Sequence, residues 1–346
     1  MILRETGKYF ITLLGCCIRE DTEPERFFDQ FYEIWDFQEL WTLLADSCPA
    51  CIHAFIQPWI LGALAVAAKE KSGTYTIIDS NDAMLFLHND PNHPDISMEE
   101  AILRQADGFT HKMPPEAIAV LRQKYEKAPP DYAVQSLPLP QLFRDRTPNG
   151  STRNRLVFAG GVIPPRLADS LGHGNHLFDP MIASTENTGL HLDILVNQNA
   201  RDMHWEEHRH YQRMEKRYPC FSFKPGVPFH QLPDILTNYH FGLLFDNLAR
   251  AQYPEEHFRF TMPTKVCSYF EAGLPLLVYE EFTTVRKLVN EHGLGLVYSL
   301  RRLEEIPALI AAADYQGLRD NVREYRQTHS MNAMIPILGE AYEPTS

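Results

Sequence analysis

Hydrophobic runs of strand length alternate with longer amphipathic segments along most of the chain. In the first half we predict strands at residues 8–16, 50–56, 74–80, 108–112 and 132–138, and helices at 58–71, 97–106 and 114–126. In the second half the predicted strands span residues 155–161, 192–197, 241–247, 274–279 and 294–299. This alternation is typical of parallel sheets whose strands are joined by crossover helices.

A polar, proline-containing segment without periodicity, residues 138–154, separates the two series of strands. Such a segment is typical of an interdomain linker, and a chain of 346 residues suits two domains. We therefore predict an α/β fold of the GT-B type, with two Rossmann-like domains facing each other across a cleft, over residues 1–145 and 146–325. Residues 326–346 are expected to form a helical tail that crosses back to the first domain.

The first residues, "MILRETGKYFITLLG", read as the end of a helix that leads into a strand, which suggests that the first βα unit is missing or reduced. Arg4, Glu5 and Lys8 interrupt this segment, so it lacks the long apolar core of a signal peptide. The apolar stretch 50–68 is split by Pro58, and we predict a strand and a helix there in place of a membrane span.

The amino-acid composition limits the cellular compartment and the kinds of partner that we expect. Six cysteines in a chain of this size fit a reducing compartment, and the pair in "CPAC" (Cys48 and Cys51) precedes a strand, whereas a redox pair should follow one. We therefore expect a cytoplasmic protein. With 32 Lys and Arg against 45 Asp and Glu, the net charge of −13 argues against nucleic acid as a partner. A small anionic ligand would need a local basic pocket.

The stretch "MPTKVCSYFEAGLPLLVY", residues 262–279, predicts a short helix that runs at once into a buried strand. Pro263 and Thr264 can start and cap this helix, whose first-turn amides carry partial positive charge. Lys265 adds a full positive charge at the same place, and this combination suits a phosphate. On position alone, a lysine in a first turn is more often a solvated residue.

A second loop with phosphate-binding character follows the first strand of the second domain. Gly160 and Gly161 let a ligand approach bare backbone, and Arg166 can bind a phosphate through two N–H groups. Both loops follow strands, and open α/β sheets bind ligands at the carboxyl ends of their strands. Tight turns also use glycine pairs, so the prediction depends on the two loops together.

These motifs resemble the nucleotide-sugar domain of retaining GT-B glycosyltransferases of the family 4 type (glycosyl transferases group 1). The residues that carry the resemblance are Pro263, Lys265, Ser268-Tyr269, "AGLP" (272–275) and the glycine loop "FAGGVIPPR". Two further similar segments are "KLVNEHGLGLVYS" (287–299) and "FKPGVPFHQLPDILTNYHFGLLF" (223–245). With the looser likeness of "ACIHAFIQP" and "TIIDSND" in the first half, the resemblance spans residues 50–300.

The resemblance implies transfer of a sugar, with retention of configuration, from a nucleoside diphosphate sugar to a sugar, lipid-linked or protein acceptor. It implies no obligatory metal and no other cofactor, because cationic side chains and amides stabilise the leaving diphosphate. Arg166 and Lys265 would act on the diphosphate, together with the amides near Gly160 and Gly161. The implied role is polysaccharide or glycolipid assembly, and peripheral contact with the inner face of the membrane stays open.

Two positions depart from the family pattern. The family usually has a glutamate that holds the donor ribose where this chain has Ser268, and often a second glutamate where Phe260 stands. Glu271 lies three residues past Ser268 and can substitute, so we expect Thr264, Ser268 and Glu271 to contact the donor. The same departures support an alternative, a GT-B-fold module that binds a sugar nucleotide or a protein without turnover.

In the first domain, His53 and Asp82 are our candidates for the sugar and acceptor side. A histidine at a strand end can contact hydroxyl groups or help proton transfer. Each of the two can equally be a structural polar residue, and Asp79 is expected to be structural.

Two other patterns suggest metal binding. "HWEEH" matches the H-x-x-E-H pattern of zinc peptidases through His204, Glu207 and His208. Its surroundings are charged on nearly every face, which favours a solvated crossover helix. "HNDPNHPD", residues 88–95, has side chains that metals accept, but we interpret it as a loop. No D-x-D pair stands where a metal-dependent transferase would need one, and no G-x-S-x-G elbow is present.

Overall fold

The computed structural model describes residues 10–15, 28–34, 36–47, 49–56, 59–146, 148, 153–165, 178–196, 205–246 and 253–343. The chain divides into two compact units. One unit, here called the N-unit, comprises residues 1–136 together with residues 331–346, and the other, the C-unit, comprises residues 137–330. The N-unit is therefore built from two separate stretches of the sequence.

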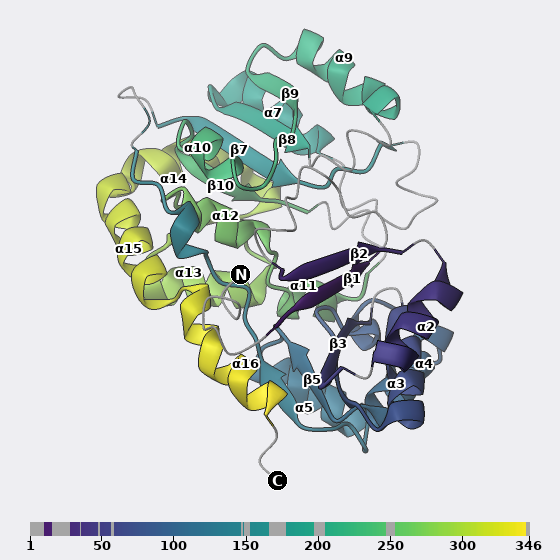
Figure 1. The fold of residues 1–346 in the computed structure, drawn as a ribbon. Helices are drawn as coiled ribbons and strands as arrows, with labels where there is room; N and C mark the ends of the chain where they lie inside the picture. The colour runs from purple at the N-terminus through teal and green to yellow at the C-terminus, as the bar shows by residue number, and fades with distance from the viewer. Residues whose placement is uncertain are drawn as a thin grey trace. The chain divides into compact units, whose positions relative to one another are not determined.

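The N-unit contains a parallel sheet in the order β3-β4-β5-β6. Its strands are β3 (Cys51–Phe55), β4 (Tyr75–Asp79), β5 (Gly108–His111) and β6 (Asp131–Ala133). Each strand is joined to the next by one crossover helix, namely α3 (Trp59–Ser72), α4 (Pro94–Gln105) and α5 (Pro115–Lys124), with η3 (Met84–Phe86) before α4 (Figure 1). This alternation is the one that the hydrophobic pattern predicts.

The rest of the N-unit comes from both ends of the chain. A small parallel sheet pairs β1 (Thr12–Gly15) with β2 (Gln30–Glu33), and α2 (Phe37–Ser47) packs against α3. The strand predicted at residues 8–16 thus corresponds to β1, which pairs outside the main sheet. From the C-terminal stretch, η9 (Met331–Met334) and α16 (Ile335–Tyr342) follow one another, and α16 packs against β5 and β6.

The C-unit contains a six-stranded parallel sheet in the order β9-β8-β7-β10-β11-β12. Its strands are β7 (Arg155–Gly160), β8 (His191–Val196), β9 (Phe221–Pro225), β10 (Phe241–Leu244), β11 (Leu276–Tyr279) and β12 (Gly295–Tyr298). Numbered along the chain this is the order 3-2-1-4-5-6, which defines a doubly wound Rossmann sheet. The direction of winding reverses between β7 and β10, and such a switch point is where these sheets bind ligands.

The described helices of the C-unit lie before, between and after its strands. They are η4 (Pro140–Leu142), α7 (Asp179–Thr188), η6 (Trp205–His208), α9 (Arg209–Arg217), α10 (Leu232–Leu236), α11 (Glu255–Phe260), α12 (Lys265–Glu271), α13 (Thr283–His292), η8 (Leu300–Glu305), α14 (Ile306–Ala312) and α15 (Tyr315–Thr328). Gly189 and Gly293 follow α7 and α13 with φ of 66° and 62°, the left-handed conformation in which glycine ends a helix.

The core of the C-unit explains why its strands are continuous apolar runs in the sequence. Every residue of β10 and β11 is buried, as are the last five residues of β8. Parallel strands that are covered by helices on both faces cannot alternate between apolar and polar residues. The hydrophobic pattern therefore located these strands well, with observed ends within a few residues of the predicted ones.

The division between the units differs from the predicted boundary at residue 145. Residues 137–146 belong to the C-unit, because Leu139 N donates to the carboxylate of Glu271 (2.9 Å) and Arg144 N donates to the carbonyl of Glu271 (2.7 Å). At the other end, α15 continues to Thr328, and the chain joins the N-unit only from Met331. The polar segment predicted as a linker thus begins inside the C-unit.

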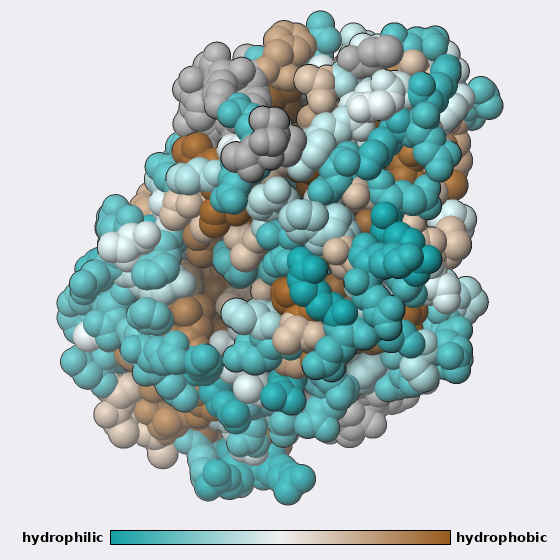
Figure 2. Space-filling model, turned by 90° about the horizontal axis from the view of Figure 1, so that it is seen from below, coloured by the Kyte–Doolittle hydropathy of each residue, from teal (hydrophilic) through white to brown (hydrophobic). Residues whose placement is uncertain are grey.

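Hydrophilic side chains cover most of the face seen in Figure 2, and hydrophobic side chains form separate patches between them. Large exposed aromatic side chains are concentrated in the N-unit, at Phe10, Phe37 and Phe55 among others. Among the described residues, no helix is both long enough and apolar enough to cross a lipid bilayer.

Candidate functional site

The strands β7 and β10 separate at the switch point of the C-unit sheet. They pair only at Phe241 with Leu156 and at Gly242 with Val157, although β7 continues to Gly160. The hydroxyl of Tyr269 lies between the two strands beyond this pairing. It accepts a hydrogen bond from Ala159 N (2.9 Å) and donates one to Leu243 O (3.1 Å). A side chain from α12 thus satisfies two backbone groups whose sheet partners have separated.

Gly242 makes this position of Tyr269 possible. A β-carbon at residue 242 would lie 2.3 Å from the Tyr269 ring, a distance that no side chain could adopt without displacing the ring. Tyr269 itself is fully buried. The glycine and the tyrosine together fix α12 against the carboxyl end of β10, and α12 begins with Lys265.

Lys265 lies beside the glycine pair at the carboxyl end of β7. Its ammonium nitrogen is 4.4 Å from the centre of the Phe158 ring, and its Cε would be 3.1 Å from a β-carbon at Gly160. Gly161, by contrast, has no atom of the described residues within 4 Å of its β-carbon position. The two predicted phosphate loops therefore do meet, with the lysine stem packed on the first glycine and open space at the second.

The charge at this place depends on burial and on one carboxylate. Burial lowers the pKa of Lys265, and the negative charge of Asp246 opposes this effect. Asp246 follows β10 and is buried. Burial raises the pKa of Tyr298, and the charge of Asp246 raises it further. Our sequence analysis did not single out Asp246, although an acidic residue directly after a strand end was a usable signal. The site thus combines one cation, one anion and the bare backbone of two glycines.

Ser268 lies in the expected helix and Thr264 directly precedes it, but Thr264 does not cap the helix as predicted. Thr264 is the residue before α12, with helical φ and ψ of −59° and −25°, and its side chain makes no capping hydrogen bond. The predicted cap is therefore wrong, because a capping side chain needs an extended backbone at that residue to reach the next amides. Val266 N and Cys267 N instead donate to Pro263 O and Thr264 O. Ser268 is half-buried and lies one helical turn after Lys265.

Glu271 has a structural role in place of the predicted donor contact. Its carboxylate accepts the hydrogen bond from Leu139 N, and only 4% of the residue is exposed. Burial raises its pKa to about 7, although the bond from Leu139 N and the charges of Arg144 and Arg326 act in the opposite direction. Phe260, at the position of the second family glutamate, is also buried.

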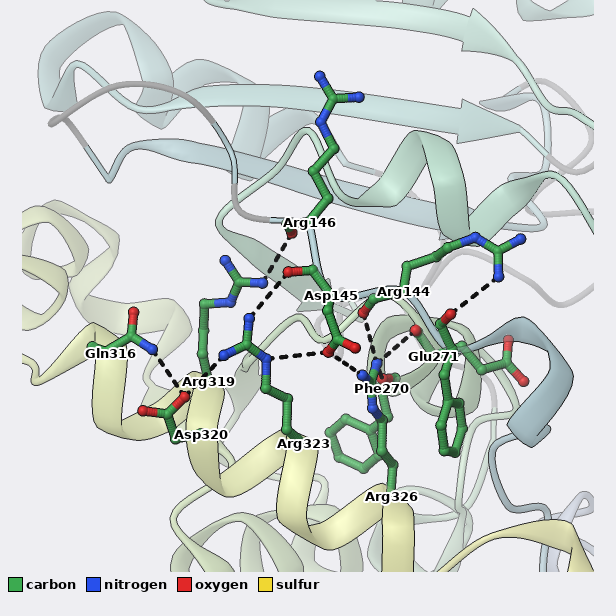
Figure 3. A network of polar contacts seen from close by, with 11 residues as sticks. Arg144, Asp145, Arg146, Phe270, Glu271, Gln316, Arg319, Asp320, Arg323 and Arg326 are labelled. Carbon is green, nitrogen blue, oxygen red and sulfur yellow. Dashed lines mark hydrogen bonds and ion pairs between the residues drawn. The ribbon is translucent and has the colours of Figure 1, made fainter.

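Arg326 of α15 holds the carboxyl end of α12 (Figure 3). Its Nη1 donates to Phe270 O (3.1 Å), to Glu271 O (2.8 Å) and to Arg144 O (2.8 Å). Its Nη2 pairs with the carboxylate of Asp145. Carbonyls at the end of a helix lack partners within the helix and carry partial negative charge, so a buried guanidinium is well suited to them.

Two further arginines of α15 bind residues 144–146, the segment that Arg326 also contacts. Arg323 Nη2 donates to Asp145 O (3.1 Å) and Arg319 Nη2 donates to Arg146 O (2.9 Å), as Figure 3 shows. Arg319, Arg323 and Arg326 follow one another along one face of α15 and bind successive residues of the segment. We call these three arginines, with residues 144–146, the arginine brace. The brace fixes the end of α12 that lies opposite Lys265.

His53 and Asp82 are the candidates in the N-unit. His53 is the middle residue of β3 and not at the strand end where we expected it, whereas Asp82 follows the end of β4. The two ring nitrogens of His53 form hydrogen bonds with Tyr342 Oη (2.6 Å) and Thr110 Oγ1 (3.1 Å), and Thr110 Oγ1 donates to Asp79 Oδ2 (3.0 Å). Tyr342 is the last residue of α16, so the C-terminal stretch contacts the predicted sugar-side histidine. Asp82 forms an ion pair with the buried Lys112 (3.4 Å) and is itself one-third exposed.

The remaining predicted residues are placed only in part. Arg166 and His204 lie outside the described residues. His208 is buried and its Nε2–H donates to Val162 O (2.9 Å), so this ring serves the interior of the C-unit. Residues 205–208 form the 3-10 helix η6, and the α-helix α9 starts only at Arg209. Residues 205–208 therefore lack the α-helical spacing that a zinc peptidase motif needs.

Burial raises the pKa of Cys51 to about 12, so this thiol is unreactive.

A cavity of about 370 Å³ lies at the carboxyl end of β12, lined by Val297, Ser299, Arg302 and Leu309 among others. β12 is an edge strand, two strands away from β10 in the sheet. This cavity is therefore distinct from the switch point, and we assign it no role in the site.

Residues 193–334, which contain Lys265 and Tyr269, match the family model described as "Glucosyltransferase 3-like, C-terminal domain". A comparison with curated protein sequences gave no match.

Among solved structures, the chain is similar to sucrose-phosphate synthase from Thermosynechococcus elongatus, with a TM-score of 0.63 and 14% identity over 90% of this chain and 80% of that one. HepE from Anabaena, in complex with UDP and glucose, matches with a TM-score of 0.62 and 10% identity, over 97% of this chain and 100% of that one. Trehalose-6-phosphate synthase from E. coli, bound to UDP-2-fluoro glucose, matches with a TM-score of 0.59 and 12% identity, over 89% of this chain and 78% of that one.

The fold is thus that of GT-B glycosyltransferases, as the sequence pattern and the resemblance predict. The C-unit is glucosyltransferase-like in sequence as well, over the residues that the family model covers.

Proposed function

We propose that this protein is a retaining, metal-independent glycosyltransferase of the family 4 type that uses a nucleoside diphosphate sugar as donor. The observation that carries the proposal is the position of Lys265, whose stem packs on Gly160 at the switch point of a doubly wound sheet. A diphosphate bound there meets an ammonium group in a partly dehydrated setting, where electrostatic stabilisation of a leaving group is most effective.

The charge state of Lys265 fits this role. Burial lowers its pKa in the free protein, whereas a bound diphosphate would raise it again, because an opposite charge favours the protonated amine. The amine therefore gains a favourable interaction when the donor binds, and a larger one when negative charge develops on the leaving diphosphate. We assign Arg166, which follows the glycine loop in the sequence, to the same diphosphate.

The donor contacts of this proposal are Gly160, Gly161, Thr264 and Ser268. Gly161 offers its backbone in open space, and the half-buried Ser268 lies on the same helix as Lys265. Glu271 is left out of the donor set because its carboxylate is buried against Leu139. Ribose recognition would then differ from that of family members with two glutamates.

On the sugar and acceptor side we propose Asp82 and His53. Asp82 is partly exposed beside Lys112, so its carboxylate can accept hydrogen bonds from sugar hydroxyls. His53 would have to exchange Tyr342 or Thr110 for the substrate. The solved relatives bound to UDP or a UDP-sugar make UDP-sugars the first donors to test. A saccharide or lipid-linked acceptor in polysaccharide assembly, in the cytoplasm or at the membrane's inner face, completes the proposal.

A thermal-shift screen against UDP-, GDP- and ADP-sugars in the presence of EDTA tests the donor site. One nucleotide class should raise the melting temperature of the wild type, and Lys265→Met should lose the shift. Lys287→Met, which removes an exposed lysine on α13, is the matched control and should keep it. A shift that survives in Lys265→Met would refute the assigned phosphate site.

Turnover decides between the enzyme and a second candidate, a binding module without activity. That candidate is favoured by the absence of both family glutamates, at Ser268 and at the buried Phe260. Release of UDP from the stabilising donor, and the anomeric configuration of the transferred sugar by NMR, would establish transfer and retention. Tight donor binding without turnover for any acceptor would support the module.

A further inference from the structure

Three potential metal ligands come together in the N-unit, in the loop between η3 and α4. They are His88, His93 and Asp95, which lie within the sequence "HNDPNHPD". One ligand atom from each residue lies within 4.8 Å of the others. The sequence pattern alone suggested an ordinary loop here, because a loop does not reveal which of its side chains converge.

The distances to the carboxylate are those of a metal site. His88 Nε2 lies 3.3 Å from Asp95 Oδ2, and His93 Nδ1 lies 3.7 Å from the same oxygen. Ligand atoms at roughly 2.0–2.1 Å from a tetrahedral zinc ion are about 3.4 Å apart. The side chains are 25%, 37% and 36% exposed, so an ion can reach them from solvent.

Hydrogen bonds within the loop hold its backbone in place, and one of them also contacts the His93 ring. His93 N donates to Asp90 O (3.0 Å), Asn92 N donates to Asp90 Oδ1 (2.9 Å) and Asp95 N donates to His93 Nδ1 (3.3 Å). Pro91 and Pro94 stiffen the backbone on either side of Asn92. A stiff loop reduces the conformational entropy that ligand residues lose when an ion binds.

The two imidazole rings lie face to face, with centres 3.6 Å apart and planes 9° apart. Lone pairs of stacked rings run parallel, so both rings must turn about their Cβ–Cγ bonds to converge on one ion. When the His93 ring turns, its Nδ1 releases Asp95 N. Their exposure leaves room for this rotation.

We propose that His88, His93 and Asp95 bind a divalent transition-metal ion of the zinc class. Two imidazoles and one carboxylate are ligands that zinc accepts, and water would complete the coordination. The ion would connect the loop after β4 to the first turn of α4 and neutralise Asp95. The site lies in the N-unit and does not depend on the proposed sugar transfer.

The test uses the full chain after dialysis against EDTA, with zinc chloride as the probe. Calorimetry should show one bound zinc ion, which should also raise the melting temperature because it binds only the folded state. His88→Ala and His93→Asn each remove one ligand. His93→Asn keeps a side-chain acceptor for Asp95 N, since asparagine is a good helix cap.

Loss of an outer-shell partner already lowers metal affinity by about 10–100-fold, so loss of a ligand should lower it by at least about 100-fold. The control is His230→Ala, which removes a histidine of the C-unit that bonds to Gln231 and lies beside the Phe229 ring, and it should leave affinity unchanged. Cobalt(II) should give the visible spectrum of a low-symmetry nitrogen and oxygen site. Zinc binding that persists in both ligand variants, or no binding by the wild type, would overturn the proposal.

Discussion

The stem of Lys265 lies against Gly160, where a β-carbon would come within 3.1 Å of Lys265 Cε. One residue ends a β-strand and the other begins an α-helix more than a hundred positions later. Because both lie at the switch point of the sheet, the spacing between them sets where the ammonium group stands relative to a bound diphosphate.

Gly160→Ala should therefore weaken binding of the nucleotide sugar. The added methyl group pushes the flexible end of Lys265 aside, so we expect a change in unfolding free energy below about 1 kcal/mol but a clear loss of donor affinity. In Gly161→Ala the new β-carbon meets no atom of the described part of the chain within 4 Å, so this variant should leave stability unchanged and reduce affinity only if the donor approaches that backbone. Donor titration and thermal unfolding of both variants provide the measurements. Unaltered affinity in Gly160→Ala would contradict the placement of Lys265.

Tyr269→Phe should destabilise the C-unit. It leaves Ala159 N and Leu243 O, both in the buried part of the sheet, without the hydroxyl that satisfies them. An unsatisfied buried group costs about 1–3 kcal/mol, so we expect a loss in that range by urea denaturation. Tyr279→Phe is the control, because the Tyr279 hydroxyl has no hydrogen bond among the described residues. Equal losses in the two variants would show that the bridge between β7 and β10 is unimportant.

Glu271 should make the protein less stable as the pH rises. Its pKa is raised from 4.5 to about 7 in the folded state, so folding favours the protonated carboxyl. Below pH 4.5 both states are protonated, and the relative stability is lost between pH 4.5 and 7, by about 3 kcal/mol in all. Glu271→Gln keeps an oxygen for Leu139 N and cannot ionise, so it should be more stable than the wild type at pH 8 and similar at pH 4.5.

Glu99 of the N-unit provides the contrast for this measurement. Burial raises its pKa to about 7 as well, but both its oxygens accept hydrogen bonds, from Ser80 Oγ and from Met84 N and Tyr125 Oη. Glu99→Gln keeps only one oxygen, so its NH2 group must face Ser80 Oγ, which would have to change from donor to acceptor. We expect this extra demand to make Glu99→Gln less stable than Glu271→Gln at each pH. Urea midpoints at pH 5 and pH 8 separate the two behaviours. A pH dependence unchanged by Glu271→Gln would contradict the pKa assigned to Glu271.

Arg326→Ala should be far more damaging than Arg323→Ala. Arg326 is 1% exposed and its loss leaves the carbonyls at the end of α12 and the carboxylate of Asp145 without their main partner. An unsatisfied buried carbonyl costs about 1–3 kcal/mol, whereas Asp145 is 69% exposed and keeps Arg323, so the loss of this ion pair adds little. Arg323 is about one-third exposed, and exposed pairs contribute only about 0–1 kcal/mol. Chemical denaturation of the two variants measures both losses of unfolding free energy. Similar losses would mean that the arginine brace stabilises the C-unit through its exposed ion pairs.

Much of this architecture could be predicted because buried parallel strands are visible as apolar runs. β11 and β12, for instance, lie within two residues of the predicted strands. β2 was missed because all four of its residues are exposed, which leaves no hydrophobic pattern. β9 was also not among the predicted strands, since Ser222 and Lys224 interrupt its apolar residues.

Only the part of the site that lies at strand ends could be predicted from the sequence. Gly160 and Lys265 were expected at carboxyl ends of strands, and the fold brings them together there. The roles of Thr264 and Glu271 depend on backbone angles and on Leu139, 132 positions from Glu271, which no local pattern encodes. The arginine brace was missed for the same reason, because it joins residues 144–146 to a helix far along the chain.

The C-terminal stretch has a consequence for how the protein is made. α16 packs on β5 and β6, and Tyr342 reaches His53, so the N-unit needs residues that are synthesised after the whole C-unit. During translation the C-unit can therefore complete its fold first, while the N-unit must wait until α16 has been synthesised. A prematurely terminated product would leave the first-made domain, and not the last-made one, incomplete.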